Sequence, residues 1–471
     1  MSKVIFLCGS PKKKTSVSLS LAKILAKFLD YDCEFVELNK SYFSYPLKKQ
    51  EKEFLEIIEK VKQADCIVWV FGVYLFFAPS QMQIFIEKLF ANNYYFKNKI
   101  TAIVSAAAQI KDDYALGKMK FVVEQLGLSH VGEVIMRSSL FGYSKNKIAE
   151  KNCYLLAQDI NWALKNKYIP IKTTYSIAKK YLFPTNSSKK IILKQKSKEK
   201  DKTRRVILMI VSSDLQKNVF AKSLVAAFKV ISKYKIEVLE LRKYNINPCL
   251  GCRRCFFNKN NICIKKDDYN KIINLFSKSA GVVFVSDCSC GIVDSCMKVF
   301  LERGFMLGKN MTFKEKHTMV VVSGGGPLNL EGISYLQDSL NTTTFCVTGI
   351  SDTNIDKPNY VDTLVRTIKF FDRAIQEDIQ KTVLFTDKGI RLIFRDDCFE
   401  LAAIFEESKN QYIKNAMFDY PKTKRISEII KMGSKDPAIK TKLVSLLKNV
   451  DKRQKNWQKK ILKQLFIYFS N

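Results

Sequence analysis

The sequence contains little histidine and no long apolar run, and each absence excludes a class of function. Its 471 residues include 2 histidines, His130 and His317, so histidine-rich zinc sites and catalysis by paired histidines are nearly excluded. The longest apolar stretch, residues 66–79, is too short to span a bilayer. We expect no secretory signal, because no long apolar segment follows Met1. The 13 cysteines then predict a cytoplasmic protein whose thiols serve metal or redox chemistry rather than disulfides.

Acidic residues are also scarce relative to basic ones. The chain has 45 Asp and Glu against 79 Lys and Arg, a formal net charge of +34. Such an excess is typical of proteins that bind an anionic cofactor, a nucleic acid or a membrane surface. The same chain is rich in Ile, Asn, Phe and Tyr, however, which is the bias that AT-rich codons produce. The charge is therefore not interpreted as the function, and no specific nucleic-acid partner is predicted.

The sequence repeats itself with a period of a little over 200 residues. An apolar strand, a turn and an amphipathic helix begin at Val4 and again at Val206, and residues 64–70 and 82–88 resemble 280–285 and 297–303. Strands that are apolar throughout and alternate with helices predict parallel sheets covered on both faces. We therefore expect an α/β fold with two tandem flavodoxin-like, doubly wound, five-stranded sheets in the order 2-1-3-4-5.

The predicted boundaries are residues 1–168 for a first flavodoxin-like domain and 204–380 for a second flavodoxin-like domain with a cysteine motif. Residues 169–203 between them are predicted to be a basic, mostly solvated linker. The segment 381–471 is expected to be mostly helical, with a short hairpin near its start, and its role is unknown. Its basic amphipathic end favours a helix packed on its own domain, with membrane-surface binding as the alternative.

The first strand-to-helix turn of the first domain predicts a phosphate site. In a doubly wound sheet this turn lies at the topological switch point, where backbone N–H groups and the helix dipole attract anions. The absence of both GxGxxG and GxxxxGK[ST] indicates a mononucleotide. The side chains expected to bind it are Ser10, Lys12, Thr15, Ser16 and Ser18. The alternative is an ordinary helix whose serine N-cap accounts for one hydroxyl.

A second loop, which follows the third strand, is aromatic and apolar. It is expected to lie against a flat ring system while its backbone N–H groups reach the polar edge of the ring. The residues predicted to bind the cofactor here are Gly72, Val73, Tyr74, Leu75 and Phe76, with Tyr74 against the ring. Ala106, in the small-residue run after the fourth strand, is expected to let the ring approach.

These residues carry a resemblance to a known family. The chain resembles two tandem copies of the NADPH-dependent FMN reductase and iron–sulfur flavoprotein family, over about residues 1–165 and 204–350. The phosphate loop of that family is matched by residues 9–18, and its next signature by residues 64–74, with Gly72 where proline is usual. The resemblance implies a flavodoxin fold, FMN as cofactor and NAD(P)H as a donor.

A cysteine motif stands in the second domain with the spacing C-x2-C-x2-C-x7-C. Its members are Cys249, Cys252, Cys255 and Cys263. Thiolates so closely spaced suit an iron–sulfur cluster better than zinc, although zinc or clustered thiols stay open. The motif is similar to the family signature, and that resemblance implies a [4Fe–4S] ligand set.

The two halves depart from the family in complementary ways. The first lacks the cysteine motif, while the second has Ser212-Ser213-Asp214 in place of Gly-Ser-Pro and carries an acid that would repel phosphate. We expect one composite unit, an intramolecular pseudo-dimer, with further assembly as a homo-oligomer left open. It would be an FMN-dependent NAD(P)H oxidoreductase that exchanges electrons with a small-molecule or protein partner. The alternatives are a non-enzymatic flavin and iron–sulfur electron carrier, or a basic scaffold with degenerate domains. No catalytic side chain is predicted.

Overall fold

The described residues fold into two compact units, and each is described by itself. Met1–Ile177 and Cys249–Cys252 belong to the first, and Ala178–Pro248 and the described residues from Arg253 onward belong to the second. The computed structural model describes residues 3–12, 16–38, 51–107, 111–137, 147–172, 174, 176–193, 203–252, 254–257, 263–304, 316–341 and 345–379. The statements that follow concern these residues.

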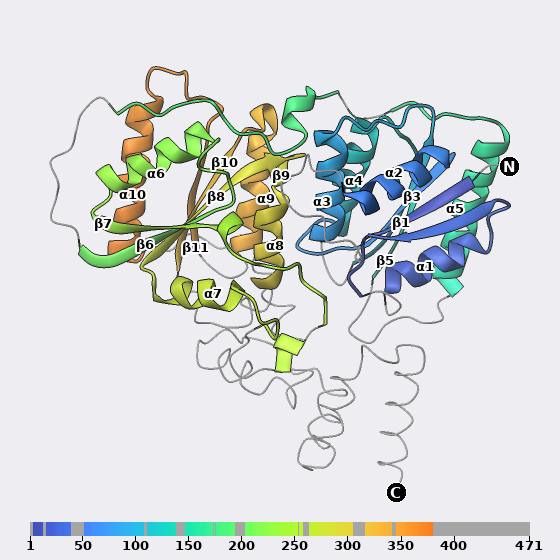
Figure 1. The fold of residues 1–471 in the computed structure, drawn as a ribbon, viewed down its shortest axis with the longest axis horizontal. Helices are drawn as coiled ribbons and strands as arrows, with labels where there is room; N and C mark the ends of the chain where they lie inside the picture. The colour runs from blue at the N-terminus through green and yellow to red at the C-terminus, as the bar shows by residue number, and fades with distance from the viewer. Residues whose placement is uncertain are drawn as a thin grey trace, which may run out of the picture. The chain divides into compact units, whose positions relative to one another are not determined.

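The first domain is a parallel sheet between two layers of helices (Figure 1). Strands and helices alternate along the chain as β1 (Lys3–Cys8), α1 (Val17–Ala26), β2 (Asp32–Glu37), α2 (Lys52–Gln63), β3 (Cys66–Gly72), α3 (Ser80–Ala91), β4 (Ile100–Ala107), α4 (Asp112–Gln125), β5 (Ser129–Arg137) and α5 (Lys147–Lys165). The strand order is β2-β1-β3-β4-β5. The chain therefore adds β2 on one side of β1 and the later strands on the other side, which starts with β3. This is the predicted order, and it places the switch point at the carboxyl ends of those two strands.

Alternation along the strands determines which side chains face α1. Cys8, Val70 and Val104 belong to the buried cluster that α1 and α5 complete. Successive side chains in a strand point to opposite faces. The residue two positions after each of these three therefore faces the same helices. Ser10, Gly72 and Ala106 therefore lie beyond the ends of this cluster, on the side of α1.

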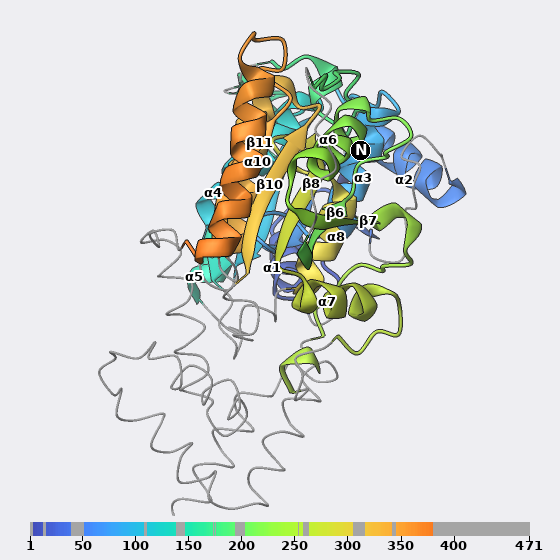
Figure 2. The ribbon, with the colours of Figure 1, turned by 90° about the vertical axis from the view of Figure 1, so that its left-hand side faces the viewer.

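The second domain repeats this arrangement. Its elements are β6 (Thr203–Val211), α6 (Val219–Ile231), β7 (Tyr234–Glu240), α7 (Tyr269–Lys278), β8 (Gly281–Ser289), β9 (Ile292–Val293), α8 (Ser295–Arg303), β10 (His317–Ser323), α9 (Asn329–Asn341), β11 (Phe345–Ser351) and α10 (Tyr360–Glu377). The order β11-β10-β8-β6-β7 is that of the first sheet read from its other edge. Helices α6 and α10 share one buried cluster with the sheet, and Figure 2 shows α10 lying along that face. The predicted α/β fold class is confirmed, while the small strand β9, antiparallel to β8, was not predicted.

The segment before β6 differs from the predicted linker. The segment from Ala178 onward belongs to the second unit, which includes Ala178–Pro248. Ser187 and Ile191 are buried, and Ile191 belongs to the cluster beneath α6 and α10. The Ser187 carbonyl accepts from the backbone N–H groups of Val219 at 2.8 Å and Phe220 at 3.3 Å. An apolar residue and two anchoring hydrogen bonds outweigh the basic composition that predicted a solvated chain.

Some predictions lie outside the described residues. These are the hairpin and helices expected within 381–471 and the side chain of Thr15. Among the helices that the structure describes, none has the length and apolar character needed to cross a membrane.

Candidate functional site

The loop between β1 and α1 brings together most of the predicted phosphate ligands. Ser16 is the N-cap of α1, and its Oγ accepts from the Leu19 backbone N–H at 3.3 Å. Ser18 lies in the first turn, with its Oγ 2.9 Å from that of Ser16. Ser10, Ser16 and Ser18 are all buried. Two hydroxyls, those of Ser16 and Ser18, at the positive end of a helix dipole form an arrangement suited to an anion.

The start of this loop runs close to its neighbours. The Gly9 backbone N–H donates to the Val70 carbonyl at 2.9 Å, so the chain still follows β3 after β1 ends. A Cβ on Gly9 would lie 2.7 Å from that of Met82, which is closer than real atoms approach. Packing against Met82 therefore requires glycine at position 9. Lys12, further along the loop, is half-buried, and its backbone N–H is 3.4 Å from the Ser10 Oγ.

The predicted ring-binding loop after β3 is a tight hairpin. The backbone N–H of Tyr74 donates to the Phe77 carbonyl at 2.7 Å, and the N–H of Phe77 donates back to Tyr74 at 3.2 Å. The two central residues, Leu75 and Phe76, have φ angles of 42° and 64°. Such a two-residue turn with positive φ at both centres normally requires Asn and Gly. Backbone strain of this kind is concentrated at functional sites.

Small residues end the strands on the side of α1. Gly72 pairs with Ala106 across β3 and β4, and the Val73 backbone N–H donates to the Ala106 carbonyl at 2.8 Å. A Cβ on Gly72 would lie 3.3 Å from the Tyr74 ring. Neither strand end carries a side chain that would fill the space before α1.

One residue at this edge was missed by the sequence analysis. Lys111, the N-cap of α4, places its Nζ 4.8 Å from the centre of the Phe76 ring, and nothing in the local sequence marks it. The buried Ser105 hydroxyl, in the small-residue run, has no hydrogen-bond partner among the described residues. Because Ser105 precedes Ala106 in β4, its side chain points to the face of the sheet away from α1. The cation against the hairpin and the buried hydroxyls of Ser16 and Ser18 fit an anionic ligand at the switch point, and the first domain therefore fits FMN.

The cysteine that precedes the loop is not a reactive thiolate. Burial, reinforced by the carboxylate of Glu37, raises the pKa of Cys8 to about 12. The thiol is therefore protonated at neutral pH and serves as a small apolar residue of the core.

The cysteine motif of the second domain lies on a loop whose two ends are tied together. Arg303 forms a buried ion pair with Asp267 and donates to the Asn247 carbonyl at 3.3 Å. The Asn247 backbone N–H donates to the same carboxylate at 3.1 Å. Beyond this stem, the Lys265 Nζ lies 3.3 Å from the Pro248 carbonyl oxygen. The stem is well defined by charge-assisted hydrogen bonds.

The four motif cysteines belong to different units, Cys249 and Cys252 to the first and Cys255 and Cys263 to the second. Each is half-buried, and no group of three or more metal-ligating side chains occurs among the described residues. The Gly251 backbone N–H donates to the Cys249 Sγ at 3.3 Å. The metal site at these four cysteines therefore stays a prediction.

Comparison with known proteins agrees with the first-domain site. Residues 2–136 match the family described as NADPH-dependent FMN reductase. This part of the chain is similar to that family. The match includes the β1–α1 loop and the hairpin after β3, which are the two features that the geometry had singled out.

Two curated relatives are described as iron–sulfur flavoproteins. The one from Archaeoglobus fulgidus is 30% identical over 110 residues, covering 22% of this chain and 49% of the relative. The one from Clostridioides difficile is 28% identical over 116 residues, covering 23% and 51%. The chain thus spans about half the length of the curated relatives that it matches. Among solved structures, an FMN-dependent NADH-azoreductase from Bacillus anthracis is 16% identical, with a TM-score of 0.27, over 35% of this chain and 99% of that one.

Proposed function

We propose that the protein is an FMN-dependent oxidoreductase whose first domain holds the flavin. The observation that carries this proposal is the FMN reductase family match over residues 2–136, which includes a loop with three buried serines at the switch point. The FMN, when bound, would supply the electron transfer, with NAD(P)H or a reduced protein as donor and a small molecule or protein as acceptor.

The residues of the first domain would bind and orient this cofactor. Ser10, Ser16 and Ser18 would donate hydrogen bonds to the phosphate, together with the backbone N–H groups that begin α1. Tyr74 and the strained hairpin would hold the ring, because a rigid loop loses little entropy when a ligand binds. The positive charge of Lys111, above Phe76, would favour the electron-rich reduced ring.

The test is an anaerobic purification of the full chain, followed by counts of FMN, iron and sulfide. We expect one FMN per chain and oxidation of NADPH that depends on it. Bound FMN with slow NADPH oxidation but fast reduction by a protein donor would indicate an electron carrier. A chain that binds no FMN even after reconstitution would contradict the proposal.

The same counts test the cysteine motif. Four irons and four sulfides per chain, each roughly, would support the cluster implied by the family resemblance. FMN without iron would leave a flavin reductase whose motif consists of thiols. In a Cys252→Ser variant, iron would be lost if the motif holds a cluster.

A further inference from the structure

The strand ends of the second domain occupy the same positions as those that frame the FMN site of the first. The Ser212 backbone N–H donates to the Val285 carbonyl at 2.9 Å, as Gly9 does to Val70. β8 pairs with β10 so that Asp287 lies opposite Ser323, as Gly72 lies opposite Ala106. Where the first domain has Ser10, Gly72 and Ala106 facing its helix α1, the second has Ser213, Asp287 and Ser323 facing α6.

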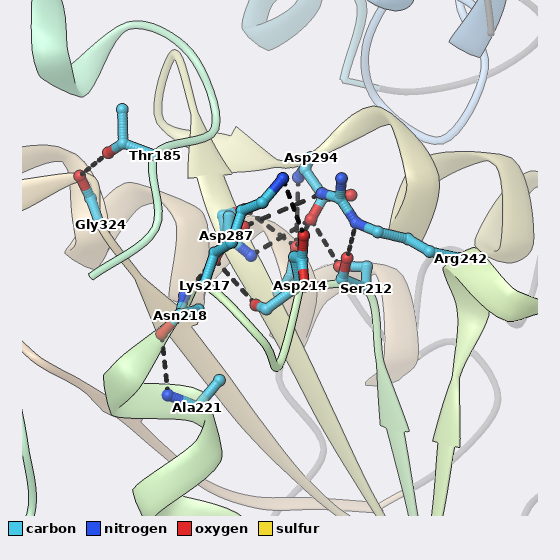
Figure 3. Close-up of polar contacts among 12 residues, drawn as sticks. Thr185, Ser212, Asp214, Lys217, Asn218, Ala221, Arg242, Asp287, Asp294 and Gly324 are labelled. Carbon is cyan, nitrogen blue, oxygen red and sulfur yellow. Dashed lines mark hydrogen bonds and ion pairs between the residues drawn. The ribbon is translucent and has the colours of Figure 1, made fainter. Parts of the chain in front are cut away.

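The difference at one of these positions is a buried carboxylate. Asp287 Oδ1 accepts hydrogen bonds from Asn218 Nδ2 at 2.6 Å, from Ser213 Oγ at 2.8 Å and from Ser323 Oγ at 3.5 Å (Figure 3). Asn218 is also the N-cap of α6, and its own Oδ1 accepts from the Ala221 backbone N–H at 2.8 Å. Asp287 is 1% exposed. Polar groups at a helix N-terminus thus converge on a carboxyl group that belongs to the chain itself.

Further groups hold this carboxylate in position. Arg242 places its NH2 atom 4.0 Å from Asp287 Oδ2 and donates through Nε to the Ser212 carbonyl. The Asp287 backbone N–H donates to Asp294 Oδ2 at 3.2 Å, and Asp294 is fixed as the N-cap of α8. Asp214, the acid that the sequence analysis expected to repel phosphate, instead accepts from the Gln216 backbone N–H at 3.0 Å.

The neighbouring loop, after β10, is covered by the segment that precedes β6. Thr185 Oγ1 donates to the Gly324 carbonyl at 3.3 Å, and the Tyr181 ring lies where a Cβ on Gly326 would have to be. The Cys290 Sγ donates to the Leu182 carbonyl at 2.8 Å. In the first domain the corresponding loop follows Ala106, which is predicted to let a flavin ring approach.

We propose that Asp287 is a built-in substitute for a ligand phosphate, and that it keeps the second domain from binding flavin or any other phosphate ester. The proposal rests on the proposed function in one respect, namely that the matching place in the first domain receives the FMN phosphate. Its physical basis is simple: an anion could enter only by displacing the carboxyl group, and it would find the donors already engaged.

The experiment is hydrogen exchange of the full chain, without FMN, in inorganic phosphate and in chloride of equal ionic strength. Peptides covering residues 213–221 report the second-domain site, and peptides covering 10–18 report the first. In the natural chain and in Asp287→Asn, which fills the same space, we expect phosphate to leave exchange at 213–221 unchanged. In Asp287→Gly, which copies Gly72, exchange there should slow about tenfold at a phosphate concentration of about ten times the Kd.

The outcomes separate this inference from the proposed function. If phosphate slows hydrogen exchange at residues 213–221 of the Asp287→Gly variant, the inference is supported, whatever phosphate does to exchange at residues 10–18. A folded Asp287→Gly chain in which phosphate changes nothing at 213–221 would overturn it. The variant Asp287→Ser, which keeps an oxygen near Asn218, is the second test if the glycine variant fails to fold. If Asp287→Gly and Asp287→Ser both fail to fold, the inference is also overturned. The carboxyl group would then be a required part of the core and not a group that a ligand phosphate could replace.

Discussion

At the scale of single residues, the two switch points differ by a few atoms with large consequences. Gly72 has no side chain, whereas Asp287 at the matching position carries a carboxyl group that accepts three side-chain hydrogen bonds. The N-terminus of α6 is thus satisfied by a group of the chain itself, while the N-terminus of α1 is the proposed site of the FMN phosphate.

Ser18 provides a direct test of the phosphate loop. Replacing it with alanine removes a buried hydroxyl expected to bind the phosphate, so FMN affinity should fall roughly 10- to 100-fold, the worth of one hydrogen bond to a charged group. Ser20→Ala is the matched control, because Ser20 lies in the same helix but is exposed. Fluorescence titration with FMN measures the affinity of each variant. Equal affinities in the two variants would exclude Ser18 from the site.

Asp287 should also make the second domain sensitive to pH. Burial, together with the nearby charge of Asp294, raises the pKa of this carboxyl to about 7. Between its unfolded pKa of about 3.9 and pH 7, the folded state keeps a proton that the unfolded state has lost. The free energy of unfolding should therefore decrease as pH rises through this window, by up to about 1.4 kcal/mol per pH unit, and level off above it.

The variant Asp287→Asn removes the titrating group and should abolish this slope. Urea unfolding followed by far-ultraviolet circular dichroism at several pH values between 5 and 8 measures it. A slope that persists in the asparagine variant would assign the proton to another group.

At the scale of elements, the hairpin after β3 joins a regular strand to a regular helix through a strained turn. Its counterpart in the second domain joins β8 to β9 and has Cys290 and Gly291 at the positive-φ centres. Gly291 adopts a positive φ without backbone strain, so only one of the two turn positions is strained there. In the first domain both positions are occupied by non-glycine residues, Leu75 and Phe76. The first domain therefore retains strain that the second has partly lost.

Leu75→Asn should stabilise the first domain. A non-glycine residue in the left-handed region costs roughly 1–2 kcal/mol, and asparagine tolerates this region better than leucine. We expect the free energy of unfolding of the FMN-free protein to increase by about 1 kcal/mol. If the Leu75 side chain also contacts the ring, FMN affinity should fall in the same variant. A destabilised FMN-free protein would show that the packing of Leu75 outweighs the strain.

Elements of strong periodicity were predictable, and the details of the site were not. Apolar strands such as β3 and β8 can be read from composition because both of their faces are buried. Ser16 was predictable because an N-cap serine before an apolar helix has a local signature. Lys111 and Asp287 act through partners more than 30 residues away in the chain, and the burial of Ile191 opposes the basic composition around it. No local pattern predicts contacts of that kind.

At the scale of the whole molecule, each domain has its own core, so we expect unfolding in two steps. FMN should raise only the transition of the first domain, by about 2.7 kcal/mol at 100 times its Kd. Tryptophan fluorescence reports this transition in a Trp457→Phe variant, because the other tryptophans, Trp69 and Trp162, both lie in the first domain. A shift of both transitions by FMN would show that the domains unfold together or that both bind flavin.

The carboxylate of Asp287 also makes the two halves of the chain depend differently on their surroundings. If the first domain binds FMN as proposed, it draws part of its stability from a cofactor that must be supplied, whereas the second domain contains its own carboxyl group in the matching place. When flavin is scarce, the first domain opens more often and becomes the preferred target of proteases, since degradation follows the population of the open form. The lifetime of the protein would then report the flavin supply through one half alone.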